Sequence, residues 1–184
     1  MTGVANEGGV IWICGLAGVG KTTLANDVVR LMRAAHPNVT QLDGDAFRKR
    51  HMPQAGYQRG DRLVVANAMS NAAWHRAHKG SLCVVSTISL FTDIHHKNRA
   101  SAAAMQLPFV LSFLSASTTL LQARRGALMR DAINVVGIDI LAEMPDAPDH
   151  KFTNDGDINS LRLEAIKIGQ LWHARQARLA RSAS

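Results

Sequence analysis

Short apolar runs alternate along the chain with longer stretches in which apolar positions recur every three or four residues. The first run, Gly9 to Cys14, is apolar at almost every position, which is typical of a strand buried on both faces of a sheet. Three similar runs lie at 39–42, 82–88 and 109–114, and a short fifth strand is expected near 150–152. Helices are predicted over 21–35, 61–79, 93–105 and 116–125, and from 157 onward.

The order of these elements predicts the fold class. Strand and helix alternate, which favours parallel β-α-β units with right-handed crossovers. We therefore expect an α/β fold, a three-layer α/β/α sandwich with a mainly parallel five-stranded sheet. The 184 residues suit a single domain, 1–184, with a core of about 9–175.

Two of the predicted helices carry further signals. Asp61 is expected to cap the long helix that ends near Lys79. The last helix has five apolar side chains on one face, which should turn toward the core. They are Ile158, Leu161, Ala165, Ile168 and Trp172.

The charge of the chain suits two kinds of partner. Lys and Arg number 21 against 14 Asp and Glu, giving a formal charge of +7, which fits either a nucleic-acid surface or a pocket for small polyanions. The basic residues form no run of five, and aromatic residues make up only 5% of the chain. A stacking surface for single strands is therefore unsupported, and no nucleic-acid partner is expected.

Cysteine content and hydropathy point to a cytoplasmic protein. Cys14 and Cys83 are too few for a disulfide scaffold and are expected to be free core thiols. The segment from Ala100 to Ala123 is uncharged and long enough to span a bilayer, but Pro108 and several polar side chains interrupt it. The first ten residues lack the pattern of a secretory signal. We expect no membrane contact.

A phosphate-binding motif follows the first predicted strand. Gly15 to Thr22 fits G-x-x-x-x-G-K-[ST] and precedes a predicted helix. Its glycines let backbone N–H groups surround a phosphate, while Lys21 supplies charge and Thr22 offers a hydroxyl to Mg²⁺. The expected ATP-phosphate contacts are Gly15, Ala17, Gly18, Val19, Gly20, Lys21, Thr22 and Thr23. The motif predicts a P-loop NTPase fold that uses ATP and Mg²⁺.

Other motifs narrow the class of P-loop protein. The additional Gly18 is typical of small-molecule and nucleotide kinases, and the N-K-x-D motif of GTPases is absent. The third predicted strand ends in Ser86-Thr87, where many P-loop proteins have a metal-organising Asp. Asp43 and Asp45 are candidates for that role because they end the second strand at the same edge of the sheet. Asp-Gly is also common in simple turns.

Five further segments resemble the adenylylsulfate (APS) kinase family in their order and spacing. They are Leu42-Asp43-Gly44-Asp45 with Arg48, then Gly56-Tyr57, Asp61-Arg62, Ile88-Ser89-Leu90-Phe91, and Asn134 with Gly137-Ile138-Asp139. The resemblance covers roughly residues 9–170. It implies transfer of the γ-phosphoryl group of Mg-ATP to the 3′-hydroxyl of a small anionic nucleotide, adenylyl sulfate, giving 3′-phosphoadenylyl sulfate. Members of this family are often dimers, so the resemblance also allows a homodimer.

The resemblance implies roles for individual residues. Asp45 matches the catalytic Asp that orients or deprotonates the acceptor hydroxyl, with Asp43 helping through the metal shell. Lys21 is the third catalytic residue, and Thr22 and Asp45 are the implied Mg²⁺ ligands. The implied substrate contacts are Arg48, Tyr57, Arg62, Ile88, Ser89 and Leu90. A basic lid over the phosphates is implied for Arg124, Arg125 and Arg130.

The chain departs from the family pattern on the acceptor side. After Asp61-Arg62 the family has x-Glu-Asn-x-Arg-Arg, whereas residues 63–67 read Leu-Val-Val-Ala-Asn, which removes the Asn and both Arg. Leu90 replaces Pro, and Val135 replaces a Phe that clamps the acceptor adenine. Losing one face of such a clamp costs about 1 to 3 kcal/mol of stacking. These variants resemble APS-kinase-like enzymes of bacterial capsule pathways, which phosphorylate cytidine diphosphoramidate. A cytidine diphosphoramidate kinase is therefore one alternative, and a non-catalytic ATP-binding regulatory module is another.

Histidines and tryptophans suggest no further site. The pairs His75/His78 and His95/His96 lack a Glu or Cys at a ligand spacing, so solvated helix faces are expected rather than a metal site. Three tryptophans are expected in the core or at an interface. They are Trp12, Trp74 and Trp172.

Overall fold

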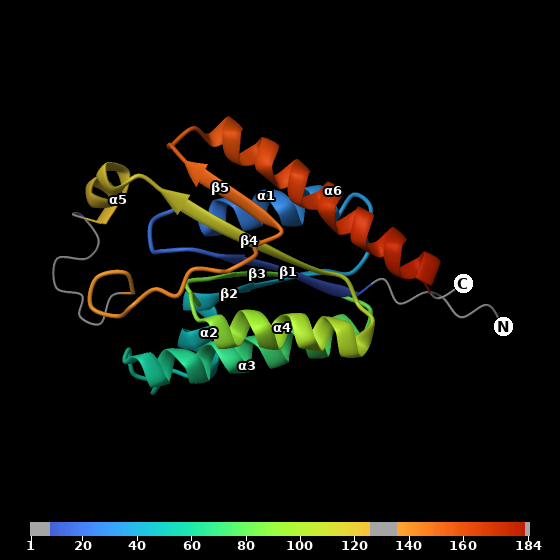
Figure 1. Ribbon diagram of the computed structural model, residues 1–184, viewed down its shortest axis with the longest axis horizontal. Helices are drawn as coiled ribbons and strands as arrows, with labels where there is room; N and C mark the ends of the chain where they lie inside the picture. Colours follow the sequence, from blue (N-terminus) through green and yellow to red (C-terminus); the bar gives the residue numbers. More distant parts are fainter. Residues whose placement is uncertain (1–7, 126–135, 183–184) are drawn as a thin grey trace.

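The computed structural model describes residues 8–125 and 136–182, which form three layers (Figure 1). In these ranges five parallel strands make one sheet in the order β2-β3-β1-β4-β5. The strands are β1 (Gly9–Cys14), β2 (Val39–Asp43), β3 (Leu82–Thr87), β4 (Phe109–Ala116) and β5 (His150–Asn154). The helices are α1 (Lys21–Met32), α2 (Gly44–His51), α3 (Arg59–His78), α4 (Thr92–Met105), α5 (Thr118–Arg125) and α6 (Ile158–Ser182). The predicted α/β fold is confirmed.

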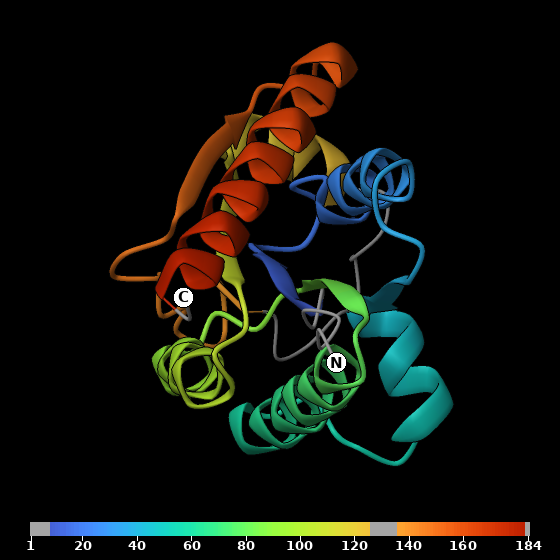
Figure 2. The ribbon, with the colours of Figure 1, turned by 90° about the vertical axis from the view of Figure 1, so that its right-hand side faces the viewer.

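The central strand β1 explains why its sequence is a continuous apolar run. All six of its residues are buried. Val10, Trp12 and Cys14 pack in one cluster with side chains of α3 and α4, whereas Ile11 and Ile13 pack in another with α1 and α6. Figure 2 shows these helix pairs covering opposite faces of the sheet. Successive side chains of a strand point to opposite faces, so a strand covered on both sides needs apolar residues at every position.

Helix α2 was not predicted. It begins directly after β2, and the carboxylate of Asp43 caps it by accepting hydrogen bonds from the backbone N–H groups of Asp45 and Ala46, both at 3.2 Å. Phe47 is its only buried residue. A helix with a single buried position has no apolar periodicity in its sequence, so the segment resembled a turn.

The start of α3 differs from the prediction. Gln58 is the N-cap residue and Asp61 lies three positions inside the helix. The Asp61 carboxylate accepts a hydrogen bond from the backbone N–H of Gln58 at 3.2 Å, which completes a capping box. The prediction of Asp61 as the cap was therefore wrong by one helical turn.

Helix α6 packs along the sheet through four of the five predicted apolar residues. Ile158 is the exception, with 45% of its surface exposed in the first turn. The fully buried Trp172 rests on the start of β1, where a Cβ atom on Gly9 would lie 2.2 Å from its Cη2. Only glycine allows this close approach of helix and strand.

The long uncharged segment from Ala100 to Ala123 is divided between the end of α4, all of β4 and the start of α5. Within the described ranges, no helix is both long and apolar enough to cross a bilayer. Cys14 and Cys83 are free and buried, as predicted. Burial raises the pKa of the Cys14 thiol to about 12 and that of Cys83 to about 11.

Candidate active site

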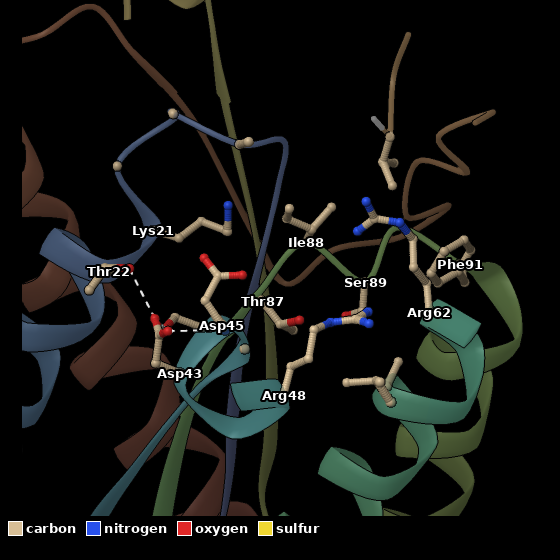
Figure 3. A pocket seen from close by; sticks show the side chains of 18 of the residues that line it. Lys21, Thr22, Asp43, Asp45, Arg48, Arg62, Thr87, Ile88, Ser89 and Phe91 are labelled. Carbon is tan, nitrogen blue, oxygen red and sulfur yellow. Dashed lines mark hydrogen bonds between the residues drawn. The ribbon is translucent and has the colours of Figure 1, made fainter. Parts of the chain in front are cut away.

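A cavity of about 510 Å³ opens where β1, β2 and β3 end (Figure 3). Its wall combines the loop after β1, the first turns of α2, one side of α3 and the segment after β3. The charged residues that line it are Lys21, Asp43, Asp45, Arg48, Arg62 and Arg124. Four cations face two carboxylates, so the cavity is suited to anionic ligands.

The loop after β1 supplies one end of the cavity. Gly18 and Gly20 have φ angles of 83° and 100°, a left-handed conformation that favours glycine. Lys21 begins α1 and its Nζ donates a hydrogen bond to the carbonyl oxygen of Leu16 at 2.8 Å, which keeps the ammonium over the loop. Ala17, Gly18 and Gly20 through Thr23 line the cavity, whereas Gly15 and Val19 do not.

The edge strand β5 holds this loop in place through Asn154, a residue that the sequence did not single out. Asn154 is 1% exposed, and its Nδ2 donates to the carbonyl oxygen of Val19 at 2.8 Å. Its Oδ1 accepts from the backbone N–H of Gly156 at 2.8 Å. A Cβ atom on Gly20 would lie 2.8 Å from Asn154 Nδ2. The amide therefore fits against the loop only because position 20 is glycine.

Asp43 is the centre of a hydrogen-bond network between three elements. Its Oδ2 accepts hydrogen bonds from the hydroxyl groups of Thr22, at 3.0 Å, and Ser86, at 2.9 Å. Its Oδ1 caps α2, so the four lone-pair sites of the carboxylate are all engaged. The Thr22 hydroxyl donates its hydrogen bond to Asp43, and its lone pairs therefore stay available to a cation.

Asp45 lies on the first turn of α2, and its side chain is exposed to the cavity. In Figure 3 the carboxylate of Asp45 points toward the ammonium of Lys21. A Cβ atom on Gly44 would lie 3.0 Å from Oγ1 of Thr87. Glycine at 44 thus lets the start of α2 approach the end of β3, which brings Asp45 over the cavity.

Two guanidinium groups flank Tyr57 at the other end. Cζ of Arg48 lies 4.5 Å from the Tyr57 ring centroid and Cζ of Arg62 lies 5.4 Å from it. Arg62 Nε also donates to the carbonyl oxygen of Tyr57 at 2.9 Å. Burial, and then repulsion from Arg48, lowers the pKa of Arg62. An anion between the two guanidinium groups would relieve this repulsion. Tyr57 itself is 53% exposed and does not line the cavity.

The segment after β3 forms the wall beside these arginines. Ile88, Ser89 and Phe91 line the cavity, as Figure 3 shows. Leu90, which the resemblance placed among the substrate contacts, is fully buried in the core and is not part of the wall. His95, expected on a solvated face, is also buried, and its Nε2 lies 3.0 Å from the carbonyl oxygen of Ser89.

The proposed lid lies partly within the described residues. Arg124 lines the cavity, and its Nη1 donates to the carbonyl oxygen of Gly18 at 2.8 Å. Val136 also lines the cavity. Nothing is described for the side chain of Arg125, and the segment with Arg130, Asn134 and Val135 lies outside the described residues.

Glu143 connects the segment around Phe91 to the start of α3 through polar contacts that the sequence did not indicate. Glu143 pairs with Arg59 at the start of α3 and accepts from the backbone N–H of Thr92 at 2.9 Å. Its own N–H donates to the carbonyl oxygen of Leu90 at 3.0 Å. Hydrogen bonds from Arg59 and then from Thr92 lower the pKa of Glu143. The partners are far apart in the chain, so no local pattern predicts them.

Comparisons of sequence identify relatives across most of the chain. A family model described as adenylylsulphate kinase matches residues 7–152. A cytidine diphosphoramidate kinase from Campylobacter jejuni is 29% identical over 142 residues, which cover 75% of this chain and 82% of the relative. An adenylyl-sulfate kinase from Myxococcus xanthus is 30% identical over 158 residues, covering 83% of this chain and 85% of the relative.

Comparison of structures agrees with these matches. The Mycobacterium tuberculosis APS kinase, solved in complex with AMPPNP and APS, has a TM-score of 0.78 at 26% identity. The similarity covers 89% of this chain and 98% of that one. A gluconokinase from Sinorhizobium meliloti shares the fold, with a TM-score of 0.65 at 17% identity, covering 96% of this chain and 99% of that one.

Proposed function

We propose that this chain, which belongs to the adenylylsulphate kinase family and is therefore a phosphotransferase, transfers the γ-phosphoryl group of ATP to a hydroxyl of a nucleotide-type acceptor. Adenylyl sulfate is the first candidate, with 3′-phosphoadenylyl sulfate as the product. The single observation that carries the proposal is that one cavity holds the phosphate loop at one end and a pair of arginines at the other. Two anionic substrates can thus meet between them.

The residues at the centre of the cavity suit phosphoryl transfer, which depends mainly on positioning and charge neutralisation. Lys21 would neutralise the phosphate oxygens of ATP. Asp45, exposed to the cavity between the loop and the arginines, would orient the acceptor hydroxyl and take its proton. Arg48 and Arg62 would hold the anionic part of the acceptor, since both guanidinium groups face the cavity.

The residues present also fit Mg²⁺, which is usually bound through one or two protein groups and the substrate phosphates. Thr22 and Asp45 would hold the ion, with Asp43 fixing the Thr22 hydroxyl through its 3.0 Å hydrogen bond. Among the described residues no group of three or more His, Cys, Asp or Glu could form a metal site, which is compatible with this sparse protein coordination. Bound there, Mg²⁺ would neutralise charge on the transferred group.

Arg124 would form part of a lid with Arg125 and Arg130. Its hydrogen bond to Gly18 links α5 to the phosphate loop, so closure of this segment on ATP would exclude water, the competing phosphoryl acceptor. The assignment of residues 1–184 to one kinase domain, the cytoplasmic location and a homodimer stay predictions.

A second acceptor has specific support. The Campylobacter jejuni relative is a cytidine diphosphoramidate kinase, and α3 presents the apolar Val65 and Ala66 to the cavity. An apolar wall offers no hydrogen bond to a base edge and would suit a smaller pyrimidine as well as a purine. Cytidine diphosphoramidate is therefore the second candidate acceptor. A purely regulatory ATP-binding module has less support, because it has no need of an exposed carboxylate between the two anion sites.

The test is an ATP-consumption assay with Mg²⁺ over adenylyl sulfate, cytidine diphosphoramidate and common nucleotides. We expect turnover with one of the first two and little with the rest. Asp45→Asn should lower kcat by about 10² or more, the scale of one acid–base contribution, with ATP affinity retained. Asp146→Asn, which changes a carboxylate that is 76% exposed and outside the cavity, is the matched control. Unchanged turnover in Asp45→Asn would contradict the assigned base, and no turnover with any acceptor would contradict the kinase proposal.

A further inference from the structure

Ser89 lines the cavity together with Arg48 and Arg62. Both of its oxygen atoms, Oγ and the carbonyl oxygen, are hydrogen-bonded to buried protein side chains. The residue is only 4% exposed, and the two donors, Trp12 and His95, are 0% and 3% exposed. The donors therefore belong to the core, and the contacts they make do not depend on exposed side chains.

Trp12 controls the hydroxyl of Ser89. Its Nε1 donates to Ser89 Oγ at 3.1 Å. An indole N–H can only donate, so the hydroxyl must accept this bond and direct its own proton elsewhere. Within ranges 8–125 and 136–182, Ser89 has no protein partner that would take that proton. The proton is therefore available on the cavity side.

His95 controls the carbonyl oxygen of Ser89. Its Nε2 lies 3.0 Å from that oxygen, and a carbonyl can only accept, so Nε2 carries the proton. Burial lowers the pKa of His95, which favours the neutral form of the ring. Because the carbonyl oxygen is engaged, Ser89 can bind a ligand mainly by donating its hydroxyl proton.

The same part of the cavity presents further donors. In the view of Figure 3, Ser89 is drawn between the side chains of Arg48 and Arg62, and all three residues line the cavity. Arg48 already donates through Nη1 to the carbonyl oxygens of Ala55 and Gly56, and Arg62 donates through Nε to that of Tyr57. A guanidinium group has no acceptor, so whatever these two side chains offer to a ligand is a donor. A wall with only donors pairs fully with oxygens that carry no hydrogen, and poorly with an N–H group.

We propose that Trp12 fixes Ser89 as a donor-only contact for the acceptor substrate, and that this wall selects a terminal oxyanion such as sulfate over a hydrogen-bearing group such as phosphoramidate. The inference rests on the proposed function, because it takes this wall to meet the acceptor nucleotide. Of the two candidate acceptors it favours adenylyl sulfate. Trp12 acts as a positioning residue, since its contact with the substrate runs through Ser89.

The experiment compares two acceptors that share the adenosine moiety, adenylyl sulfate and adenosine 5′-diphosphoramidate, in the full chain with Mg-ATP. The wild-type protein should prefer the sulfate in kcat/KM by about tenfold, the scale of one matched hydrogen bond. Ser89→Ala should raise KM for the sulfate by about tenfold, with kcat and the KM for ATP within about twofold. It should also remove most of the preference.

Trp12→Phe keeps the hydroxyl but frees it to rotate and accept. The preference should therefore fall toward one, with less loss of turnover on the sulfate than in Ser89→Ala. Trp172→Phe is the matched control, because Trp172 is also fully buried but its Nε1 has no hydrogen-bond partner in the described part of the chain. A role of Trp12 in packing alone would leave the ratio between the two acceptors unchanged.

The outcomes separate the two proposals. A wild-type preference for the phosphoramidate, or a sulfate preference that survives in Ser89→Ala, would overturn the inference and leave the kinase proposal standing. If neither nucleotide is turned over, adenylyl sulfate fails as the acceptor, while the kinase proposal fails only if cytidine diphosphoramidate is not turned over either; titration calorimetry with the two adenosine nucleotides then makes the same comparison by affinity. Absence of binding to either one would overturn the inference as well. Ser89→Ala keeps the test decisive if Trp12→Phe does not fold.

Discussion

Replacing Asp43 by Asn should separate folding from catalysis. The carboxylate caps α2 through Oδ1 and accepts the hydroxyl protons of Thr22 and Ser86 through Oδ2. Asparagine caps a helix about as well as aspartate, so the bonds to Oδ1 can persist. Its amide nitrogen can only donate, however, and both hydroxyl groups must then rotate to accept. One of the two Thr22 lone pairs is thereby engaged, and the hydroxyl proton turns toward the side on which Mg²⁺ would bind.

The two effects differ in size. Exchanging charge-assisted for neutral hydrogen bonds in Asp43→Asn costs about 1 kcal/mol of unfolding free energy. Asp43→Ala loses the cap, worth about 1 kcal/mol. It also leaves the Ser86 hydroxyl, in a residue that is 1% exposed, without its acceptor at about 1 to 3 kcal/mol. For a chain of this length, 1 kcal/mol lowers Tm by about 2 to 4 °C. We expect a drop of roughly 3 °C for Asn and roughly 10 °C for Ala.

Activity should not follow that order. Both variants should lose about 10² in kcat/KM for Mg-ATP, since misplacing a group at the reacting centre costs that much. Thermal unfolding with and without Mg-ATP, together with initial rates over a range of Mg²⁺ concentrations, measures both quantities on the same samples. If Asp43→Asn keeps kcat/KM within about threefold of the wild type, Asp43 is only a helix cap and the proposed role of Thr22 is wrong.

Three further predictions concern residues outside the catalytic centre. Asn154→Ala should raise the KM for ATP by about tenfold or more by releasing the phosphate loop and should cost about 1 to 3 kcal/mol of stability; an unchanged KM would show that the loop holds itself. Hydrogen bonds from Arg59 and a backbone N–H hold the pKa of Glu143 below 4.5. The stability this adds is therefore present above pH 4.5 and lost as pH falls through the lowered pKa, so the Tm difference between wild type and Glu143→Gln should shrink in acid; a constant difference contradicts this. Cys14 and Cys83, with pKa values of about 12 and 11, should react with a thiol reagent at pH 8 only after unfolding.

The sheet and the phosphate loop could be predicted because their signals are local. A strand covered on both faces is apolar throughout, as in β1 and β3, and Gly15 to Thr22 specifies the turn and the helix start within eight positions. The position of Asp43 and Asp45 followed from parallel topology, because carboxyl ends of the strands meet at one edge. These steps need no knowledge of distant contacts.

The parts that escaped prediction depend on tertiary packing. Helix α2 buries one side chain and is held by its cap and by the close fit of Gly44 on Thr87. Whether Leu90 or its neighbours face the cavity depends on the turn of the chain after β3. Asn154 and Glu143 act through partners that are distant in sequence. A single sequence carries no mark of such pairs.

The strand order has a consequence for when the site comes into existence. β1 carries the phosphate loop, yet its neighbours in the sheet are β3 and β4, which begin only at Leu82 and Phe109. Contacts between segments so far apart form late and slowly. A nascent chain that has not yet released β4 from the ribosome would therefore have the full phosphate-binding motif but only part of the framework that shapes it. Nucleotide binding should then act as a selective stabiliser of the completed fold.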